Sequence, residues 1–386
     1  MKKRFSLFLL TCLLLPLGLF SCDRGKPVDP ETLAVAGEDI SKFTIVYAPS
    51  YSEEFLDAFE EFLGYDYEHN LETANKLQKL FADTFGVTLP VAKAGEAQTE
   101  YEILVGKSDD GFKDNEYAVR VEGKKLIVTG GSDGAVYHAL DAFKKAFAET
   151  TVADMVWEEG FLLTGDAKMK RVACIGDSLT EGSIGGHVTP ELAYPAALQR
   201  FLWQDYNVYN YGLGGTSMIN SSTNPYMSSK QYADCLASGM TYDVILVMLG
   251  TNDSKVIGDT WTDAANDEFM SCAKTLFASL KEKSPNARFA YMNCPVKFTE
   301  AGYANEYMLP VQKEAAKMLA DEGYDITHYD MRAYTTEVLT KDNFPKDGLH
   351  PNYEGYYKIA EGVLDLVYHL VDGDENDATK YLIALE

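Results

Sequence analysis

The chain has 386 residues, which is more than one hydrophobic core usually organises, so two domains are expected. Hydrophobic residues make up 46% of it and aromatic residues 12%, enough for packed interiors rather than disorder. The 34 basic and 59 acidic residues give a formal charge of −25, which disfavours nucleic acid and anionic lipid surfaces as partners.

The first residues have the pattern of an export signal. Basic residues at positions 2–4 precede an apolar run over residues 5–20. An uncleaved membrane anchor is the alternative, but the run is shorter than the ~20 residues of a spanning helix and contains Pro16. Its end, Leu19-Phe20-Ser21-Cys22, resembles the lipobox of bacterial lipoproteins. That resemblance implies a lipoprotein signal peptide over residues 1–21, a lipid on Cys22 as the sole membrane attachment, and export to the cell surface or periplasm.

The polar stretch 22–38 contains two prolines and is expected to be a tether. The sequence pattern then predicts a small α/β domain over residues 39–162. Strand patterns are expected at 44–48, 101–105, 116–121 and 125–129, and helices at 71–85 and 134–147. This order of elements is too short for a common kind of independent enzyme.

Three motifs of this unit resemble the small N-terminal domain that precedes the barrel of β-hexosaminidases and α-glucuronidases. They are Ile103-Leu104-Val105-Gly106, the segment 125–131 and the segment 134–139. The resemblance implies an accessory role without catalytic residues. The stretch Gly130-Gly131-Ser132-Asp133-Gly134 also spells the G-x-S-x-G elbow of α/β-hydrolases. Because a different domain follows it, we expect a tight turn there.

A second domain is expected over residues 166–372, followed by a C-terminal tail at 373–386. Strands are predicted at 172–175, 206–211, 244–249, 289–292 and 325–330, and helices at 194–203, 229–237, 264–281, 309–322 and 353–370. Alternating strands and helices at this spacing predict a parallel sheet covered on both faces. Ligands of such sheets bind at the carboxyl ends of the strands.

Four sequence blocks stand at those strand ends or before the last helix. They are Gly176-Asp177-Ser178-Leu179-Thr180, the segment 210–215, Gly250-Thr251-Asn252-Asp253, and Asp347-Gly348-Leu349-His350-Pro351. In this order they resemble the SGNH (GDSL) hydrolase family over about 200 residues. The resemblance implies a doubly wound, flavodoxin-like α/β fold and hydrolysis of esters by a serine nucleophile.

The residues themselves fit that chemistry. A serine hydroxyl becomes a good nucleophile only when a base takes its proton, and an imidazole, with an ordinary pKa of ~6.5, suits that task. His350 follows Asp347 by three residues, and Pro351 keeps His350 out of a helix. We therefore expect Ser178, Asp347 and His350 to form a catalytic triad.

The family resemblance also implies an oxyanion hole made of the backbone N–H groups of Ser178 and Gly215 and the side-chain amide of Asn252. Read alone, Ser178 could be a helix N-cap and Asn252 a turn residue. Four blocks in register favour the catalytic interpretation.

No histidine or cysteine cluster has metal-ligand spacing, so neither a metal nor a cofactor is expected. Four cysteines remain after Cys22, namely Cys174, Cys235, Cys272 and Cys294, and they allow three disulfide pairings. Cys174 lies in an apolar strand pattern, which favours a buried free thiol there.

Within the SGNH group the chain is most similar to carbohydrate O-acetylesterases of the xylan and sialic-acid types. The residues behind this are Tyr194-Pro195, Asn210-Tyr211-Gly212, Asn224-Pro225-Tyr226, the segment 250–255 and Trp261. The resemblance implies removal of acetyl or other small acyl groups from carbohydrate. Tyr226 and Trp261 are expected to border Ser178 and stack on a sugar ring, the alternative being hydrophobic plugs under long loops.

Three other functions remain open from the sequence. A lysophospholipase or thioesterase with the same triad would need a long apolar groove for its acyl chain. A glycan-binding lipoprotein would bind with little turnover. An acyltransferase would prefer a sugar hydroxyl to water as the acceptor.

Overall fold

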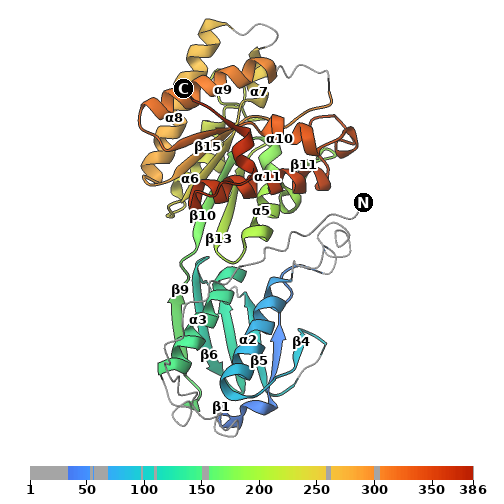
Figure 1. The fold of residues 1–386 in the computed structure, drawn as a ribbon, viewed down its shortest axis with the longest axis vertical. Helices are drawn as coiled ribbons and strands as arrows, with labels where there is room; N and C mark the ends of the chain where they lie inside the picture. Colours follow the sequence, from blue (N-terminus) through green and yellow to red (C-terminus); the bar gives the residue numbers. More distant parts are fainter. Residues whose placement is uncertain are drawn as a thin grey trace, which may run out of the picture.

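The computed structural model describes residues 34–52, 55, 68–96, 99–107, 111–149, 156–257, 262–299 and 305–385. Two α/β domains lie end to end along the long axis of the molecule, and the chain passes between them once, from β9 into β10 (Figure 1). The predicted signal peptide, Cys22 and the predicted tether as far as residue 33 lie outside the described residues. The prediction that the tether extends to residue 38 is wrong, because residues 34, 35 and 38 pair in a small sheet of the first domain. In the part of the chain that is described, no helix has the length and apolarity needed to cross a bilayer.

The first domain is a six-stranded sheet with two helices packed on it. From edge to edge the strands are β4 (Val91–Lys93), β3 (Thr44–Tyr47), β5 (Glu102–Lys107), β7 (Lys125–Gly130), β6 (Glu116–Glu122) and β9 (Leu162–Asp166). The helices are α2 (His69–Phe85) and α3 (Asp133–Glu149), and a small second sheet joins β1 (Ala34–Val35), β2 (Glu38–Asp39) and β8 (Val156–Trp157). The short helix η2 (Ile40–Lys42) leads into β3.

Helix α2 forms where the apolar spacing predicted it. Ala74, Leu77, Phe81 and Phe85 recur on one side of the helix and are buried in the core of the domain. Gly86 ends the helix in the left-handed conformation, and its N–H donates to the carbonyl of residue 82.

The sheet of the first domain extends further than the sequence indicated. Strand β9 pairs antiparallel with β6 from Leu162 to Asp166, so the domain runs past its expected end at residue 162. Its side chains are mostly exposed, and an exposed edge strand lacks the alternation on which a sequence-based prediction depends. Strand β4 was missed because it has only three residues.

The second domain has the strand order of a flavodoxin-like sheet. Its strands are β13 (Tyr206–Gly212), β10 (Lys170–Gly176), β14 (Val244–Met248), β15 (Arg288–Met292), β16 (Ile326–Tyr329) and β17 (Leu382–Ile383), in this spatial order. The first five are parallel, and in chain order they are arranged 2-1-3-4-5. The predicted doubly wound α/β fold is confirmed.

Helices cover both faces of this sheet. One face carries α5 (Tyr194–Leu202), α10 (Met331–Val338) and α11 (Tyr353–Asp372), and the other carries α6 (Lys230–Ala237), α8 (Asp263–Lys283) and α9 (Asn305–Asp321). Shorter elements at the strand ends are α4 (Ser178–Glu181), β11 (Ser183–Ile184), β12 (His187–Val188), η4 (Pro190–Leu192), η5 (Tyr226–Ser228), α7 (Thr251–Ile257), η6 (Lys341–Asn343) and η7 (Asp377–Tyr381).

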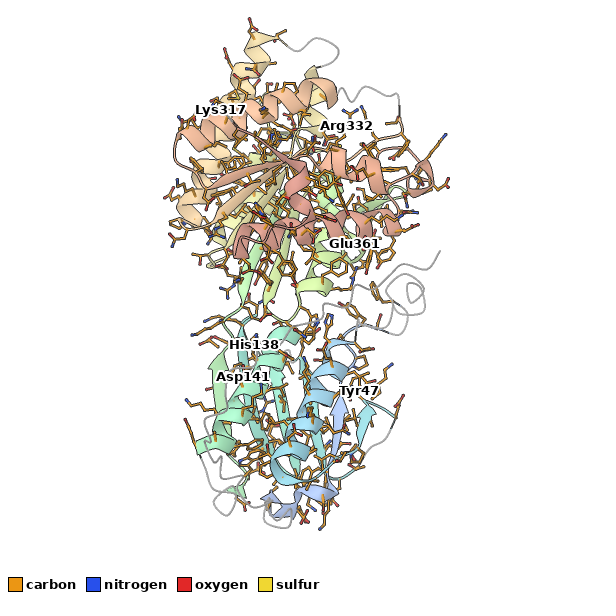
Figure 2. The ribbon with its side chains drawn as sticks, viewed as in Figure 1. Tyr47, His138, Asp141, Lys317, Arg332 and Glu361 are labelled. Atoms are coloured by element: carbon orange, nitrogen blue, oxygen red, sulfur yellow. The ribbon has the colours of Figure 1, made fainter. Side chains whose placement is uncertain are left out.

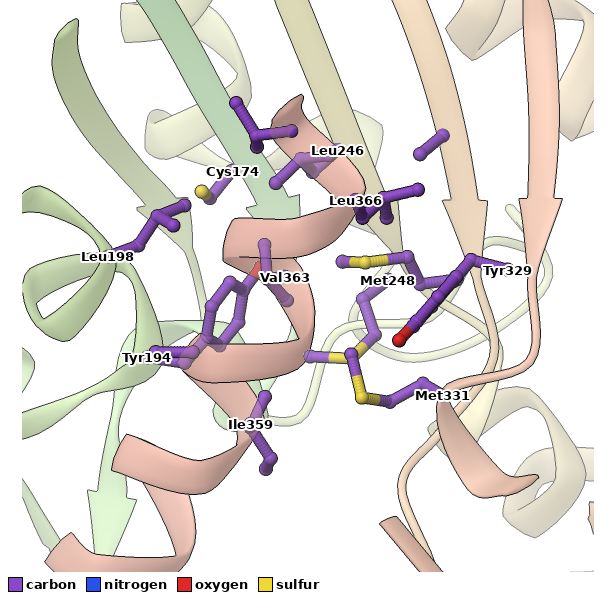
Figure 3. Packing of buried hydrophobic residues seen from close by; sticks show 14 of the residues in the cluster. Cys174, Tyr194, Leu198, Leu246, Met248, Tyr329, Met331, Ile359, Val363 and Leu366 are labelled. Atoms are coloured by element: carbon purple, nitrogen blue, oxygen red, sulfur yellow. The ribbon is translucent and has the colours of Figure 1, made fainter. Parts of the chain in front are cut away.

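Alternate residues of the central strands point to opposite faces. Cys174 and Leu246 pack against Val363 and Leu366 of α11, where Figure 3 shows them. Ile175 and its neighbours on β14 pack on the opposite face. The continuous apolar run in β14 follows from burial on both sides.

Residues beyond 372, expected to be a tail, instead complete the second domain. Strand β17 pairs antiparallel with β16, and the Asp330 N–H donates to the Tyr381 carbonyl at 2.8 Å. The Tyr381 ring packs edge-on against Tyr329 and Tyr334. Two residues of strand are too few for a periodic sequence signal.

Specific polar contacts join the two domains. Arg171 forms two hydrogen bonds with the Asp114 carboxylate, both of 3.1 Å. His138 Nε2 lies 3.0 Å from the Gln204 carbonyl, and Figure 2 shows His138 at the end of the first domain that faces the second. The His69 ring stacks on Trp203 with 4.5 Å between centroids. The domains therefore share a packed interface.

Candidate active site

Ser178 lies at the carboxyl end of a central strand. Strand β10 ends at Gly176, and the chain turns at once into α4, of which Ser178 is the first residue. Asp177 caps this helix, with its Oδ1 accepting the Leu179 N–H at 3.0 Å. Strand β10 and helix α4, joined by a single residue, thus hold the backbone of Ser178 at the edge of the sheet where ligands bind.

The structure brings Ser178, His350 and Asp347 together. Ser178 Oγ lies 2.8 Å from His350 Nε2, and His350 Nδ1 lies 2.6 Å from Asp347 Oδ2. Because a carboxylate only accepts hydrogen bonds, Nδ1 carries the proton and the Nε2 lone pair faces the serine hydroxyl. This arrangement can deprotonate Ser178 as the hydroxyl attacks an electrophile.

The loop from Asp347 to His350 holds the acid in its ionised form. Burial would raise the pKa of Asp347, but hydrogen bonds from the His350 N–H and imidazole and from the Leu349 N–H outweigh it and lower the pKa. Gly348 has φ of +69°, and a Cβ there would meet the Phe298 carbonyl at 2.5 Å. Only glycine fits this turn.

Two backbone N–H groups beside the nucleophile have no acceptor among the described residues: those of Ser178 and Gly215. The N–H of Gly214, the residue before Gly215, donates to Glu181 Oε2 at 2.8 Å and is therefore occupied. Gly215 has φ of +75°, which a side-chain-bearing residue rarely adopts. The geometry therefore leaves the two N–H groups named by the family resemblance available to an oxyanion.

Asn252 is the second residue of α7, just beyond the carboxyl end of the neighbouring strand β14. Its Nδ2 donates to the Thr216 carbonyl at 2.9 Å, and the second N–H is 3.4 Å from Asp177 Oδ2. The shorter bond holds the amide against the loop that carries Gly215. The longer contact is at the limit of a hydrogen bond, so this N–H is the one that a developing oxyanion can recruit.

We expect Asn252→Ala to lower kcat by about 10²–10³, the usual cost of losing one oxyanion donor. KM should change much less, because the contact strengthens only as negative charge develops. Steady-state kinetics on a small acetyl ester measure both parameters. An unchanged kcat with a raised KM would mean that Asn252 holds substrate rather than the oxyanion.

Two buried carboxylates that the motif analysis gave no role position this site. Asp253 accepts the Met218 and Ile219 N–H groups, both at 2.9 Å, and so fixes the segment that follows Gly215. Asp177 caps α4 and faces Asn252. Asp177 directly follows β10, and Asp253 lies in the first turn of α7 after β14. Both acids stand inside the sequence blocks at these strand ends, and that placement was the available signal.

Burial raises the pKa of Asp177 and of Asp253 to about 6, and each retains backbone hydrogen bonds that lower it. In the unfolded chain an Asp titrates near ~3.9, so between pH ~4 and ~6 the folded state binds more protons. Stability should therefore fall as pH rises through this window and level off above it. The lowered pKa of Asp347 has the opposite effect on stability: it makes stability rise with pH, in a lower pH range.

Asp177→Asn should flatten this pH dependence. At ~1.4 kcal/mol per pKa unit, it should remove about 3 kcal/mol of the decrease in the free energy of unfolding. Denaturant unfolding at several pH values between 4 and 7 measures it. Asp267→Asn is the matched control, because Asp267 lies exposed on α8. Equal slopes in the wild type and Asp177→Asn would contradict the buried-acid account.

The prediction that Tyr226 borders the substrate is wrong. Tyr226 is fully buried, its N–H donates to the Ser217 carbonyl at 2.8 Å, and its hydroxyl donates to the Tyr211 carbonyl at 2.7 Å. It is the hydrophobic plug of the alternative interpretation, since an aromatic ring in a long loop also serves to anchor that loop. Trp261 lies outside the described residues.

An exposed aromatic residue that the sequence analysis missed lies beside the triad loop. The Phe298 N–H donates to the Gly348 carbonyl at 2.6 Å. The Phe298 side chain is 40% exposed, and its ring lies 5.2 Å from that of Phe344 between centroids. It follows β15 without a motif around it, so only the fold relates it to His350.

The remaining expectations concern other polar groups. The four cysteines among the described residues are buried and form no disulfide with one another, and burial raises the pKa of Cys174 to about 12. No group of three His, Cys, Asp or Glu side chains able to hold a metal occurs within the described ranges. Ser132 is a helix cap: its Oγ accepts the Ala135 N–H at 3.1 Å and donates to the Asp114 carbonyl at 2.6 Å.

Comparison with known proteins finds similarity over the residues that form this site. Residues 174–358 match the model of the GDSL-like lipase/acylhydrolase family. A curated relative, an acetylxylan esterase of Xylanibacter ruminicola, is 31% identical over 209 residues, which are 50% of this chain and 42% of that protein. The chain thus spans less than half the length of this relative.

Similar solved structures include a putative arylesterase from Agrobacterium tumefaciens, with 21% identity and a TM-score of 0.41 over 53% of this chain and all of that chain. A carbohydrate acetylesterase family member from Sinorhizobium meliloti has 22% identity and a TM-score of 0.41 over the same shares. The family match lies within the second domain, which is thus similar to the GDSL-like lipase/acylhydrolase family and contains the Ser178–His350 pair.

Proposed function

We propose that this protein is a serine esterase that removes acetyl groups from carbohydrate. The observation that carries the proposal is the chain of contacts from Ser178 Oγ through the His350 imidazole to Asp347, at 2.8 and 2.6 Å. The 31% identity to an acetylxylan esterase supports acetyl as the acyl group and carbohydrate as the class of substrate.

The reaction follows from these groups. Ser178 Oγ attacks the ester carbonyl carbon while His350 Nε2 takes the hydroxyl proton. The tetrahedral oxyanion is held by the Ser178 and Gly215 N–H groups and the Asn252 amide. Collapse expels the sugar alkoxide, which receives the proton from His350, and leaves an acetyl-enzyme. A water molecule, deprotonated by His350, then attacks this ester. Collapse releases acetate, and His350 returns the proton to Ser178 Oγ.

The surroundings of Ser178 favour a small acyl group on a polar carrier. Glu181 and the exposed Asn224 flank the Gly214–Gly215 turn, and Asn224 Nδ2 donates to the Gly214 carbonyl at 3.4 Å. Amide and carboxylate groups suit sugar hydroxyls better than an alkyl chain. Phe298 offers an exposed ring for stacking on a sugar.

A panel of p-nitrophenyl esters tests the acyl preference. We expect kcat/KM to be highest for acetyl and to fall at least tenfold by octanoyl, because the polar flank gives a long chain no apolar contact. Ser178→Ala corrects for spontaneous hydrolysis. A preference for octanoyl would favour a lysophospholipase or thioesterase, and a folded wild type without turnover would favour a glycan-binding protein.

We further infer that the first domain is an accessory unit and that a lipid on Cys22 anchors the protein at a membrane after export. The motifs at 103–106 and 125–131 support the first inference, and the Leu19–Cys22 lipobox supports the second. Metabolic labelling with a fatty-acid analogue tests the anchor. Label should be lost in Cys22→Ser, and label retained there would contradict it.

A further inference from the structure

The carboxylate of Glu181 lies beside the nucleophile, although Glu181 is no member of the triad. Ser178 is the first residue of α4 and Glu181 is the last, so a single helical turn carries both side chains. Glu181 Oε2 accepts the Gly214 N–H at 2.8 Å. A Cβ on Gly214 would lie 2.6 Å from this oxygen and 3.6 Å from Ser178 Cβ. Glycine at position 214 therefore lets the carboxylate approach the backbone next to Ser178.

The Gly214–Gly215 segment needs an anchor of this kind. Glycine has more backbone conformations open to it than any other residue, so two consecutive glycines form an intrinsically flexible segment. Gly215 is exposed and has φ of +75°, and its N–H is one of the two available to an oxyanion. A donor of this type accelerates the reaction only if it is oriented before the charge develops. The sequence of the segment does not supply that orientation by itself.

Side chains hold the peptide units on both sides of Gly214. Glu181 binds its N–H, and Asn224 Nδ2 donates to its carbonyl at 3.4 Å. That carbonyl shares a planar trans peptide with the Gly215 N–H, which points in the opposite direction. The contact with Glu181 is the shorter of the two, and an ionised acceptor makes it roughly twice as strong as a neutral hydrogen bond. Glu181 is therefore the stronger of the two anchors.

The backbone that carries Glu181 is itself fixed. Asn210 Nδ2 donates to the Thr180 carbonyl at 2.8 Å, and Asn210 Oδ1 accepts the Gly212 N–H at 2.9 Å. Gly212 packs so closely on α4 that a Cβ there would overlap the backbone nitrogen of Glu181. Helix α4 is thus bound to the end of β13. The turn that positions the nucleophile is also a rigid base for the carboxylate.

Charge alone gives Glu181 no favourable role at this place. A carboxylate near a developing oxyanion raises the energy of that anion, and it has no N–H to donate. A benefit to the reaction can come only through the backbone that Glu181 holds. The same reasoning provides a test, because glutamine keeps an acceptor oxygen and removes the charge.

We propose that Glu181 is a positioning residue of the oxyanion hole. Its carboxylate fixes the peptide units of Gly214, so that the Gly215 N–H is oriented toward the oxyanion before the ester binds. Glu181 acts through the backbone and contacts no reacting atom. This inference rests on the serine mechanism of the proposed function, but not on which acyl carrier the protein uses.

Steady-state hydrolysis of p-nitrophenyl acetate by the full-length protein tests this role. Glu181→Ala should lower kcat by about 10- to 100-fold, less than the loss of a whole donor, and change KM by less than about threefold. Glu181→Gln should recover most of this loss, because its amide oxygen can accept the Gly214 N–H. Glu282→Ala is the matched control, since Glu282 is exposed near the end of α8.

Melting curves identify any variant that fails to fold. An unchanged kcat in folded Glu181→Ala would contradict the proposal, and a raised KM alone would mean that Glu181 binds substrate instead. Glu181→Gln as slow as Glu181→Ala would show that the charge matters rather than the contact with Gly214.

Gly214→Ala tests the same contact from the other side. Its Cβ would displace the carboxylate oxygen, so kcat should fall much as in Glu181→Ala. The double variant should be about as slow as either single variant, because both substitutions break one interaction and their effects are not additive. A loss equal to the product of the two single losses would contradict the proposal.

The rate of labelling by a fluorophosphonate separates this inference from the proposed function. The phosphonyl oxygen of the probe takes the place of the ester carbonyl oxygen, so labelling depends on Ser178 and the oxyanion donors but not on the acyl carrier. Glu181→Ala should label at least about fivefold more slowly than the wild type. A wild type that labels at Ser178 but releases no acetate from carbohydrate would contradict the proposed function and, with slow labelling of Glu181→Ala, support this inference. Equal labelling rates in the wild type and folded Glu181→Ala would overturn this inference alone.

Discussion

Ser178→Ala should reduce the hydrolysis of a small acetyl ester by at least ~10⁴-fold while leaving the fold intact. Removing the nucleophile of a serine triad costs about as much as removing all three members, because the groups act as one unit. Among the described residues the Ser178 hydroxyl hydrogen-bonds only to His350, so its loss disturbs no structural contact. Initial rates on p-nitrophenyl acetate, together with a melting curve, measure both effects.

Ser132→Ala is the matched control for this prediction. Ser132 stands in the other serine motif of the chain, but its Oγ caps α3, so its loss should cost about 1 kcal/mol of stability and no activity. A fluorophosphonate probe should label Ser178 in the wild type. An adduct mapped to Ser132 by mass spectrometry would be incompatible with this account.

Asp347→Asn should lower kcat by about 10⁴-fold, the effect known for the same substitution in a serine triad. The amide oxygen can still accept the Leu349 and His350 N–H groups that Asp347 Oδ1 binds at 2.9 Å. Its NH₂ group then faces His350 Nδ1 and forces the other tautomer, with the proton on Nε2. A histidine in that tautomer cannot accept the Ser178 proton.

The pH profile distinguishes this explanation from simple misfolding. Residual activity in Asp347→Asn should rise with hydroxide concentration at alkaline pH, because the solvent must replace the missing base. Wild-type kcat/KM should fall on acidification as the imidazole binds a proton and can no longer act as a base. A variant with near wild-type kcat would show that Asp347 does not orient His350.

Much of the second domain could be predicted from sequence because its signals are strong. The apolar runs of β10 and β14 are buried on both faces, and Ser178, Asn252 and His350 stand in motifs next to strand or helix ends. The proximity of Ser178 to His350, 172 positions apart, follows from the parallel sheet, since the carboxyl ends of its five parallel strands meet at one edge.

Other features depend on tertiary contacts that no local pattern records. The burial of Tyr226 is decided by the Tyr211 carbonyl and the helices around it, not by its own neighbours in sequence. The pairing of β17 with β16 joins residues more than 50 positions apart through two residues of strand. A pocket lined by His69 of the first domain and Arg200 of the second exists only because two separate domains meet there.

Release of acetate from acetylated xylan tests the central claim most directly. The account predicts that the wild type liberates acetate, that Ser178→Ala liberates none, and that a chelator has no effect on the rate. Enzymatic quantification of free acetate over time measures this without a synthetic leaving group. A folded wild type that releases no acetate from the polymer yet cleaves long-chain lipid esters would contradict the account.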